Sequence, residues 1–205
     1  AQNNLGKTLI DKGLVKEAIA HLQQALVLKA DYFDAHINLG AALTKLNRFQ
    51  EGIEEFEQAL KIDPNSKKAY DDLGVAFFRL GRNADAIKNY EKALKKDPSD
   101  AEAHNNLAVS FIQDGRFSEA VEHLKRAMQI RPGYISAQNN LAEAYAGLHQ
   151  SSDAIVAARK AIQLARSQGN SALAQQIEDW LKRYRAGPEE GENGKDEHTR
   201  GKEEK

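Results

Sequence analysis

One short phrase recurs along this chain at a fixed interval of 34 residues. Its five versions are NNLGKTL from residue 3, INLGAAL from 37, DDLGVAF from 71, NNLAVSF from 105 and NNLAEAY from 139. Other positions keep the same register, including the series Ala25, Ala59, Ala93, Ala127 and Ala161. A fixed period of about 20 to 50 residues is typical of repeat architectures, in which each unit contacts only its neighbours. The sequence therefore predicts an elongated array without a single central core.

Within one unit the apolar residues follow a helical spacing. Between residues 101 and 133 they recur three or four positions apart in two runs: His104, Leu107, Ala108 and Phe111, then Ala120, Val121, Leu124, Ala127 and Met128. The tripeptide DGR separates the runs, and Pro132 ends the second because proline cannot continue a helix. Each unit is predicted to be two antiparallel helices. Gly81, Gly115 and Asn47 stand at the turns, where a positive φ is useful.

The third unit carries a family resemblance. At the characteristic positions of the tetratricopeptide repeat it has Tyr70, Leu73, Gly74, Phe77, Ala86, Tyr90, Ala93 and Pro98. The chain resembles this family over residues 1–168, which divide into five units: 1–32 (incomplete at its start), 33–66, 67–100, 101–134 and 135–168. The resemblance implies an all-α fold, a right-handed superhelical solenoid of antiparallel helix pairs. The exchange of glycine for Ala108 and Ala142 is small for small and leaves this expectation intact.

Two segments follow the repeats. Residues 169–186 are predicted to form a C-terminal capping helix with one apolar stripe and a polar outer face. The stripe consists of Leu173, Ile177, Trp180, Leu181 and Tyr184. A solenoid needs such an element, since its terminal unit otherwise exposes a stacking surface. Residues 187–205 lack large apolar side chains and mix both charges, so we expect a disordered tail.

The start of the chain shows no comparable cap. Ala1 lies about two residues into the first predicted helix, when the repeat register is used as the guide. We therefore expect the chain to be the C-terminal part of a longer array or a longer protein. We also expect its N-terminal face to be capable of self-association, because a bare stacking surface is apolar.

Composition narrows the classes of partner. The formal net charge is -1, and no basic stretch forms a stripe that could follow phosphates, so we expect no nucleic-acid binding. No apolar run is long enough to cross a bilayer, so we expect no direct membrane insertion. Cysteine is absent, which excludes disulfides and thiolate chemistry. The sequence does not identify the compartment, and both the cytoplasm and the exported side of a membrane stay open.

The recurring phrase predicts a binding groove. Its second letter gives the series Asn4, Asn38, Asp72, Asn106 and Asn140, which we call the ladder. In tetratricopeptide arrays the first helix of each unit lines a concave surface. Asparagine is about 0.6 kcal/mol worse than alanine inside a helix, yet its amide matches both hydrogen-bonding groups of a peptide unit. With the wording AHINLG and AHNNLA, the ladder resembles that of the superhelical domain of O-linked N-acetylglucosamine transferases, without their catalytic domain. Hydrogen bonds between neighbouring units, or to water, are the alternative role.

Residues beside the ladder indicate what the groove would prefer. The predicted apolar strip consists of Ile37, Val75, Phe78, Val109 and Ile112, and Phe78 has packing between units as its alternative role. Charges of both signs flank the strip, so a moderately apolar, extended peptide fits best. Lys68 is the candidate cation. A clamp for a terminal carboxylate fits poorly, because Asp72 lies one turn after Lys68 where such a clamp needs a second cation.

Nothing in the sequence favours catalysis. The histidines belong to different helices or turns, and His36 and His104 stand where the repeat usually has a bulky core residue. Motifs for metals or nucleotides are not recognisable, so we expect no enzyme activity, no cofactor and no metal. The function predicted is a protein-interaction scaffold that binds an extended segment of a partner. The alternative is a substrate-recruiting or anchoring domain of a larger enzyme or membrane protein whose other part lies N-terminal to residue 1.

Overall fold

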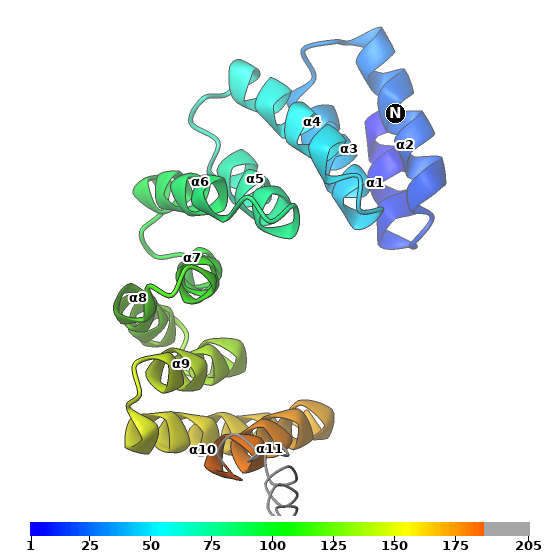
Figure 1. Cartoon of the computed structure of the whole chain (residues 1–205). Coiled ribbons are helices and arrows are strands. Elements are labelled where there is room, and N and C mark those ends of the chain that lie inside the picture. Colours follow the sequence, from blue (N-terminus) through cyan, green and yellow to red (C-terminus); the bar gives the residue numbers. More distant parts are fainter. Residues whose placement is uncertain (187–205) are drawn as a thin grey trace, which may run out of the picture.

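A computed structural model describes residues 1–186 of the chain (Figure 1). These residues form helices joined by short turns, and no strand occurs among them. The helices are α1 (Gln2–Asp11), α2 (Val15–Leu28), α3 (Phe33–Lys45), α4 (Phe49–Ile62), α5 (Lys67–Arg79), α6 (Asn83–Lys96), α7 (Ala101–Gln113), α8 (Phe117–Ile130), α9 (Ile135–Gly147), α10 (Ser151–Ser167) and α11 (Ser171–Ala186). The predicted all-α class is confirmed for this part of the chain.

The turns inside the hairpins use the left-handed backbone region. Gly81 and Gly115 have φ values of 78° and 72°, as the sequence predicts, and Asn47 has 60°. His149 takes the same position between α9 and α10 with a φ of 59°. Glycine reaches this region without a steric penalty, and asparagine visits it more readily than most residues. The turns therefore reverse the chain tightly enough to hold each pair of helices antiparallel.

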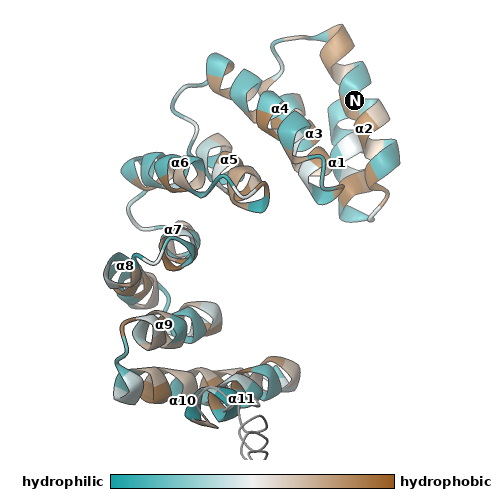
Figure 2. Ribbon diagram, viewed as in Figure 1, coloured by the Kyte–Doolittle hydropathy of each residue, from teal (hydrophilic) through white to brown (hydrophobic). Residues whose placement is uncertain are grey.

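The hairpins stack one after another into a curved array (Figure 1). Each second helix packs against the first helix of the next hairpin, through the pairs α2 with α3, α4 with α5, α6 with α7 and α8 with α9. Helices α5 and α7 lie on the inner side of the curve, and α6 and α8 lie on the outer side. One apolar cluster runs from α3 to α11, and a second joins α1 and α2 to α3. Hydrophobic residues lie mainly between the helices (Figure 2).

Close contacts between the helices depend on small residues. In the alanine series of the second helices, Ala59, Ala93, Ala127 and Ala161 are fully buried. Glycines in the first helices face large side chains, as Gly40 faces the Phe56 ring and Gly74 faces the Tyr90 ring. A methyl group at either glycine would lie within 2.6 Å of a ring atom. Backbones can approach closely here only because one side contributes almost no volume.

The last helix covers the end of the array. Helix α11 packs against α10, and Ile177 and Leu181 are buried in the shared core. Asn170 caps it, since its side-chain oxygen accepts a hydrogen bond from the backbone N–H of Leu173. Trp180 packs against this core and stacks on Tyr184 with ring centroids 5.2 Å apart, as expected for a residue of the cap. The predicted tail, 187–205, lies outside the described residues.

Candidate functional site

The first helices form a continuous inner surface. Each contacts the next first helix along the array, from α1 with α3 to α7 with α9. The ladder residues lie on these helices: Asn4 is exposed, and Asn38, Asp72, Asn106 and Asn140 are half-buried. Half-burial leaves part of each side chain accessible. The ladder is therefore placed where it can contact both a neighbouring unit and a ligand.

Two ladder asparagines bond to the preceding unit. Asn38 Nδ2 donates to Asn3 Oδ1 at 2.9 Å, and Asn140 Nδ2 donates to Asn105 Oδ1 at 2.9 Å. The acceptors Asn3 and Asn105 are each only 6% exposed. Sequence reasoning missed these two acceptors. The doubled asparagines at 3–4 and 105–106 were the available signal, because the first letter of each pair accepts the bond.

This bond forms where the preceding unit has an asparagine directly before its own ladder residue. The second and third units have Ile37 and Asp71 at that position. Within the described residues no such bond forms from Ile37 to Asp72 or from Asp71 to Asn106. Asn106 Oδ1 accepts only a 3.4 Å bond from Asn105 Nδ2, and its own Nδ2 has no partner in this part of the chain. Asn4 likewise makes no side-chain hydrogen bond there. The ladder thus has two members that join units and two with free amide donors.

We expect Asn140→Ala to lower the free energy of unfolding by about 1 kcal/mol, because it leaves the buried Asn105 amide oxygen without a donor. Asn106→Ala serves as the matched control. It removes no bond between units, so it should change stability by less than about 0.5 kcal/mol or raise it slightly through helix propensity. Urea denaturation of both variants checks this. Equal losses in the two would show that the bond from Asn140 contributes nothing specific.

Most of the predicted apolar strip is partly accessible to solvent. Val75, Phe78, Val109 and Ile112 are half-buried. Val75, Phe78 and Ile112 also pack with one side against the core. Ile37 differs from the prediction: it is 2% exposed and belongs to the same apolar cluster as Ile53 and Phe56 of α4. Four side chains therefore keep partly accessible apolar surface beside the ladder.

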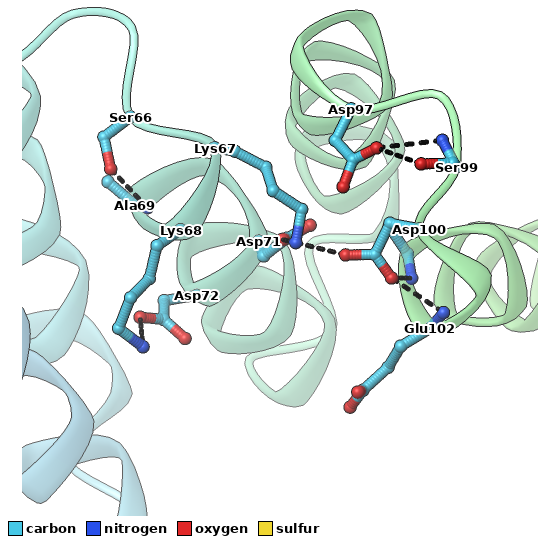
Figure 3. Close-up of polar contacts among 11 residues, drawn as sticks. Ser66, Lys67, Lys68, Ala69, Asp71, Asp72, Asp97, Ser99, Asp100 and Glu102 are labelled. Atoms are coloured by element: carbon cyan, nitrogen blue, oxygen red, sulfur yellow. Dashed lines mark hydrogen bonds and ion pairs between the residues drawn. The ribbon is translucent and has the colours of Figure 1, made fainter.

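Lysines and carboxylates meet on α5 and at the start of α7 (Figure 3). Lys68 Nζ lies 3.2 Å from Asp72 Oδ2, so the predicted cation is already paired one helical turn away. Lys67 lies between two carboxylates, 2.8 Å from Asp71 Oδ2 and in contact with Asp100. Asp100 also caps α7 by accepting from the backbone N–H groups of Glu102 and Ala103. This network joins the third and fourth units.

The pKa values of these carboxyls shift in opposite directions. It raises the pKa of Asp72 and of Asp71 above the ordinary value, because desolvation outweighs the attraction of the neighbouring lysines. For Asp100 burial alone would have the same effect, but hydrogen bonds from Lys67 and from two backbone N–H groups lower its pKa. At Asp71 and Asp72 the neighbouring lysines therefore compensate the buried charge only in part.

The histidines serve the hairpins. His36 Nδ1 lies 2.7 Å from Glu55 Oε2 and its Nε2 lies 2.8 Å from the Ala30 carbonyl oxygen. In the fourth unit His104 Nδ1 lies 2.8 Å from His123 Nδ1, and His104 Nε2 donates to the Pro98 carbonyl at 3.2 Å. With its Nε2 protonated, neutral His104 accepts at Nδ1 and His123 donates. Each pair joins the two helices of one hairpin, which agrees with a packing role.

Stability should fall as the pH falls from about 6.5, the ordinary histidine pKa. Burial lowers the pKa of His104 and of His123, and repulsion from His104 lowers that of His123 further. The folded chain therefore binds protons at these rings less readily than the unfolded chain, and the free energy of unfolding decreases through the acidic range. His123→Asn, which copies Asn89 of the third unit, should reduce this decrease. Urea denaturation at about pH 7.5 and about pH 5 measures it; an unchanged pH dependence in the variant would contradict the assignment.

Comparisons with known proteins agree with the repeat pattern. Models described as tetratricopeptide repeat match residues 31–99, 72–135 and 111–176, and one described as TPR repeat matches residues 6–47. No curated protein sequence matches the chain. No helix in residues 1–186 is both long enough and apolar enough to span a membrane.

Solved structures share the fold. A crystal structure of MamA is 23% identical, with a TM-score of 0.75 over 80% of this chain and 96% of that one. MamA 41-end from Desulfovibrio magneticus RS-1 is 22% identical, with a TM-score of 0.77 over 82% and 94%. YrrB, described as a TPR protein with an unusual peptide-binding site, is 21% identical, with a TM-score of 0.71 over 87% and 90%. The predicted solenoid fold is confirmed, and together with the models that span residues 6–176 these findings show that the chain belongs to the tetratricopeptide repeat family.

Proposed function

We propose that this chain is a protein-interaction scaffold that holds an extended segment of a partner along its first helices. The tetratricopeptide solenoid supports a scaffold in general, and YrrB is a neighbour whose description includes a peptide-binding site. The finer proposal rests on the difference between two groups of ladder asparagines. Asn4 and Asn106 keep free amide donors, while Asn38 and Asn140 are fixed by bonds to the preceding unit.

The fixed asparagines prepare the groove for a peptide. The Nδ2 groups of Asn38 and Asn140 are occupied, but their Oδ1 atoms accept no hydrogen bond within the described residues and can receive a peptide N–H. The free Nδ2 groups of Asn4 and Asn106 can donate to a peptide C=O. Because the bonds between units hold two side chains in one orientation, less side-chain entropy is lost on binding. The array thus offers donors and acceptors that need no particular peptide sequence.

The residues beside the ladder would determine which peptides bind best. Packed helices lie about 8 to 10 Å apart and an extended chain rises about 3.3 Å per residue, so each unit spans roughly three peptide residues. Val75, Val109 and Ile112 are half-buried and would offer apolar contact to side chains on one side of such a peptide. The Lys68–Asp72 pair offers charges of both signs at the centre. A moderately apolar segment with few charges therefore fits best. The same groove would serve a substrate-recruiting or anchoring domain of a larger protein.

Selection of natural disordered peptides on the chain tests the proposal. The parent is compared with the double variant Asn4→Ala/Asn106→Ala, which removes the free amides without touching the bonds between units. Gln24→Ala is the control, because it removes an exposed amide from the second helix of the first unit. The double variant loses one amide donor at each of two positions, and we expect it to bind selected peptides about tenfold more weakly than the parent. We expect the control to bind as the parent does. Equal binding by all three would exclude the ladder as the gripping element.

A further inference from the structure

A hollow of about 500 Å³ is lined by residues of α6, α7 and α8. Leu94 of α6 and Leu107 of α7 line it and are 9% and 1% exposed, and Pro98 of the connecting loop adds further apolar surface. His104 of α7 also lines it, whereas the ladder residue Asn106, two positions later, lies on another side of that helix. A volume of roughly 300 to 1,000 Å³ with a mainly apolar lining is typical of sites for small organic ligands. The hollow is therefore a candidate binding site separate from the ladder.

The exposed part of the hollow carries three charged side chains. These are Glu91 and Lys95 of α6 and Arg126 of α8. Within residues 1–186 neither Lys95 nor Arg126 forms an ion pair, and the Arg126 side chain makes one hydrogen bond, to Gln129 Oε1 at 3.2 Å. Two cations against one anion leave a positive surplus beside apolar surface. This lining is complementary to a ligand with an apolar body and one anionic group, which an arginine can bind through two parallel hydrogen bonds.

One repeat earlier, a tyrosine ring occupies the equivalent position. Tyr70 takes the place of His104, and Lys92 takes that of Arg126, at the 34-residue interval. The Tyr70 hydroxyl donates to the Pro64 carbonyl at 3.1 Å, and Lys92 Nζ lies 5.1 Å from the centre of the Tyr70 ring. An aromatic ring there lies between the loop proline and the cation of the following second helix, in a favourable cation–π contact.

In the fourth unit a smaller ring stands at this position. His104 Nε2 donates to the Pro98 carbonyl at 3.2 Å, and His104 Nδ1 lies 2.8 Å from Nδ1 of His123. His123 also lines the hollow and takes the place of Asn89 in the third unit. These two contacts hold the imidazole of His104 against the loop and α8. Because an imidazole is smaller than the phenol ring of tyrosine, the space beside Arg126 stays open as the hollow.

We propose that this hollow binds a small aromatic carboxylic acid. The ring of the ligand lies against Leu94 and Leu107, in the space that the larger Tyr70 ring takes up one repeat earlier. Its carboxylate pairs with the Arg126 guanidinium, and Lys95 adds a second positive charge. Apolar contact supplies most of the affinity, and the two cations select an acid over a neutral compound. The site uses no ladder residue, so it is independent of the function proposed for the groove.

Titration of the isotope-labelled chain with phenylacetate, followed through its amide NMR signals, tests this proposal. We expect a Kd of about 1 mM, in keeping with a ligand of about ten non-hydrogen atoms. The signals that shift should belong to the residues around the hollow on α6, α7 and α8. Phenylacetamide keeps the ring but carries no charge, so it should bind at least about fivefold more weakly than the acid.

Two variants separate the contributions of ring and carboxylate. His104→Tyr/His123→Asn installs the residues that the third unit carries at these positions, which fills the hollow, and it should bind phenylacetate at least about tenfold more weakly. Arg126→Gln leaves the hollow open and should remove the preference for acid over amide. Because Arg126 is exposed, this variant tests the carboxylate contact even if the double variant unfolds. Lys88→Gln removes an exposed cation of α6 outside the hollow and should bind as the parent does.

Three results would overturn the proposal. A parent whose signals do not shift at up to about 20 mM phenylacetate would show that the hollow binds no such acid. A folded double variant that binds as tightly as the parent would place the ligand elsewhere. Equal affinity of the parent for acid and amide would show that the cations do not recognise the carboxylate. None of these outcomes depends on peptide binding, which is measured separately.

Discussion

Gly40→Ala should lower the free energy of unfolding by about 1 to 3 kcal/mol. The added methyl group would lie 2.6 Å from Cε1 of the Phe56 ring and 2.8 Å from its Cδ1. Phe56 is 1% exposed and cannot turn away without displacing the core around it. Gly40 lies in an α-helix, where alanine has the higher propensity, so any loss arises from packing.

The fourth unit shows how this cost can be relieved. There Ala108 takes the place of Gly40, and Leu124, which is smaller than phenylalanine, takes the place of Phe56. In a Phe56→Leu background, Gly40→Ala should therefore cost less than about 0.5 kcal/mol, which makes the two substitutions strongly non-additive. Urea denaturation of the two single variants and the double variant measures the coupling. Additive losses would show that the glycine is not held small by the ring.

Ala127→Leu should likewise lower the free energy of unfolding by about 1 to 3 kcal/mol. Ala127 is fully buried and belongs to the apolar cluster that joins α8 to its neighbours. Three extra carbon atoms have no space there unless the helices move apart. Ala84→Leu, on the exposed side of α6, is the control and should change stability by less than about 0.5 kcal/mol. Thermal unfolding that is the same for parent and Ala127→Leu would remove the packing role of the alanine series.

The sequence predicted the fold well because the same pattern of helix and turn residues recurs in every unit. The register placed Gly81 and Gly115 at turns, and the structure gives both a positive φ. Asn47 was assigned by analogy with them and has the same conformation. Local propensity and short-range periodicity decide such features, so a single chain contains enough information to locate them.

The groove was harder to predict because it depends on contacts between units. The bonds from Asn38 to Asn3 and from Asn140 to Asn105 join residues 35 positions apart, one more than the repeat period. Their existence depends on how neighbouring first helices are offset, which no single helix pattern encodes. Ile37 shows the same limit: its place beside Asn38 favoured the groove, but packing in the core buries it.

Photo-cross-linking of a selected peptide to the chain tests the central claim most directly. A photoreactive residue replaces either Val75 or Val109 on the first helices, or the exposed Lys88 or Glu122 on the second helices. If an extended peptide lies along the ladder, the peptide becomes attached at Val75 and Val109, at peptide positions separated by roughly three residues. Attachment mainly at Lys88 or Glu122 would contradict the account, because the partner would then bind the outer surface.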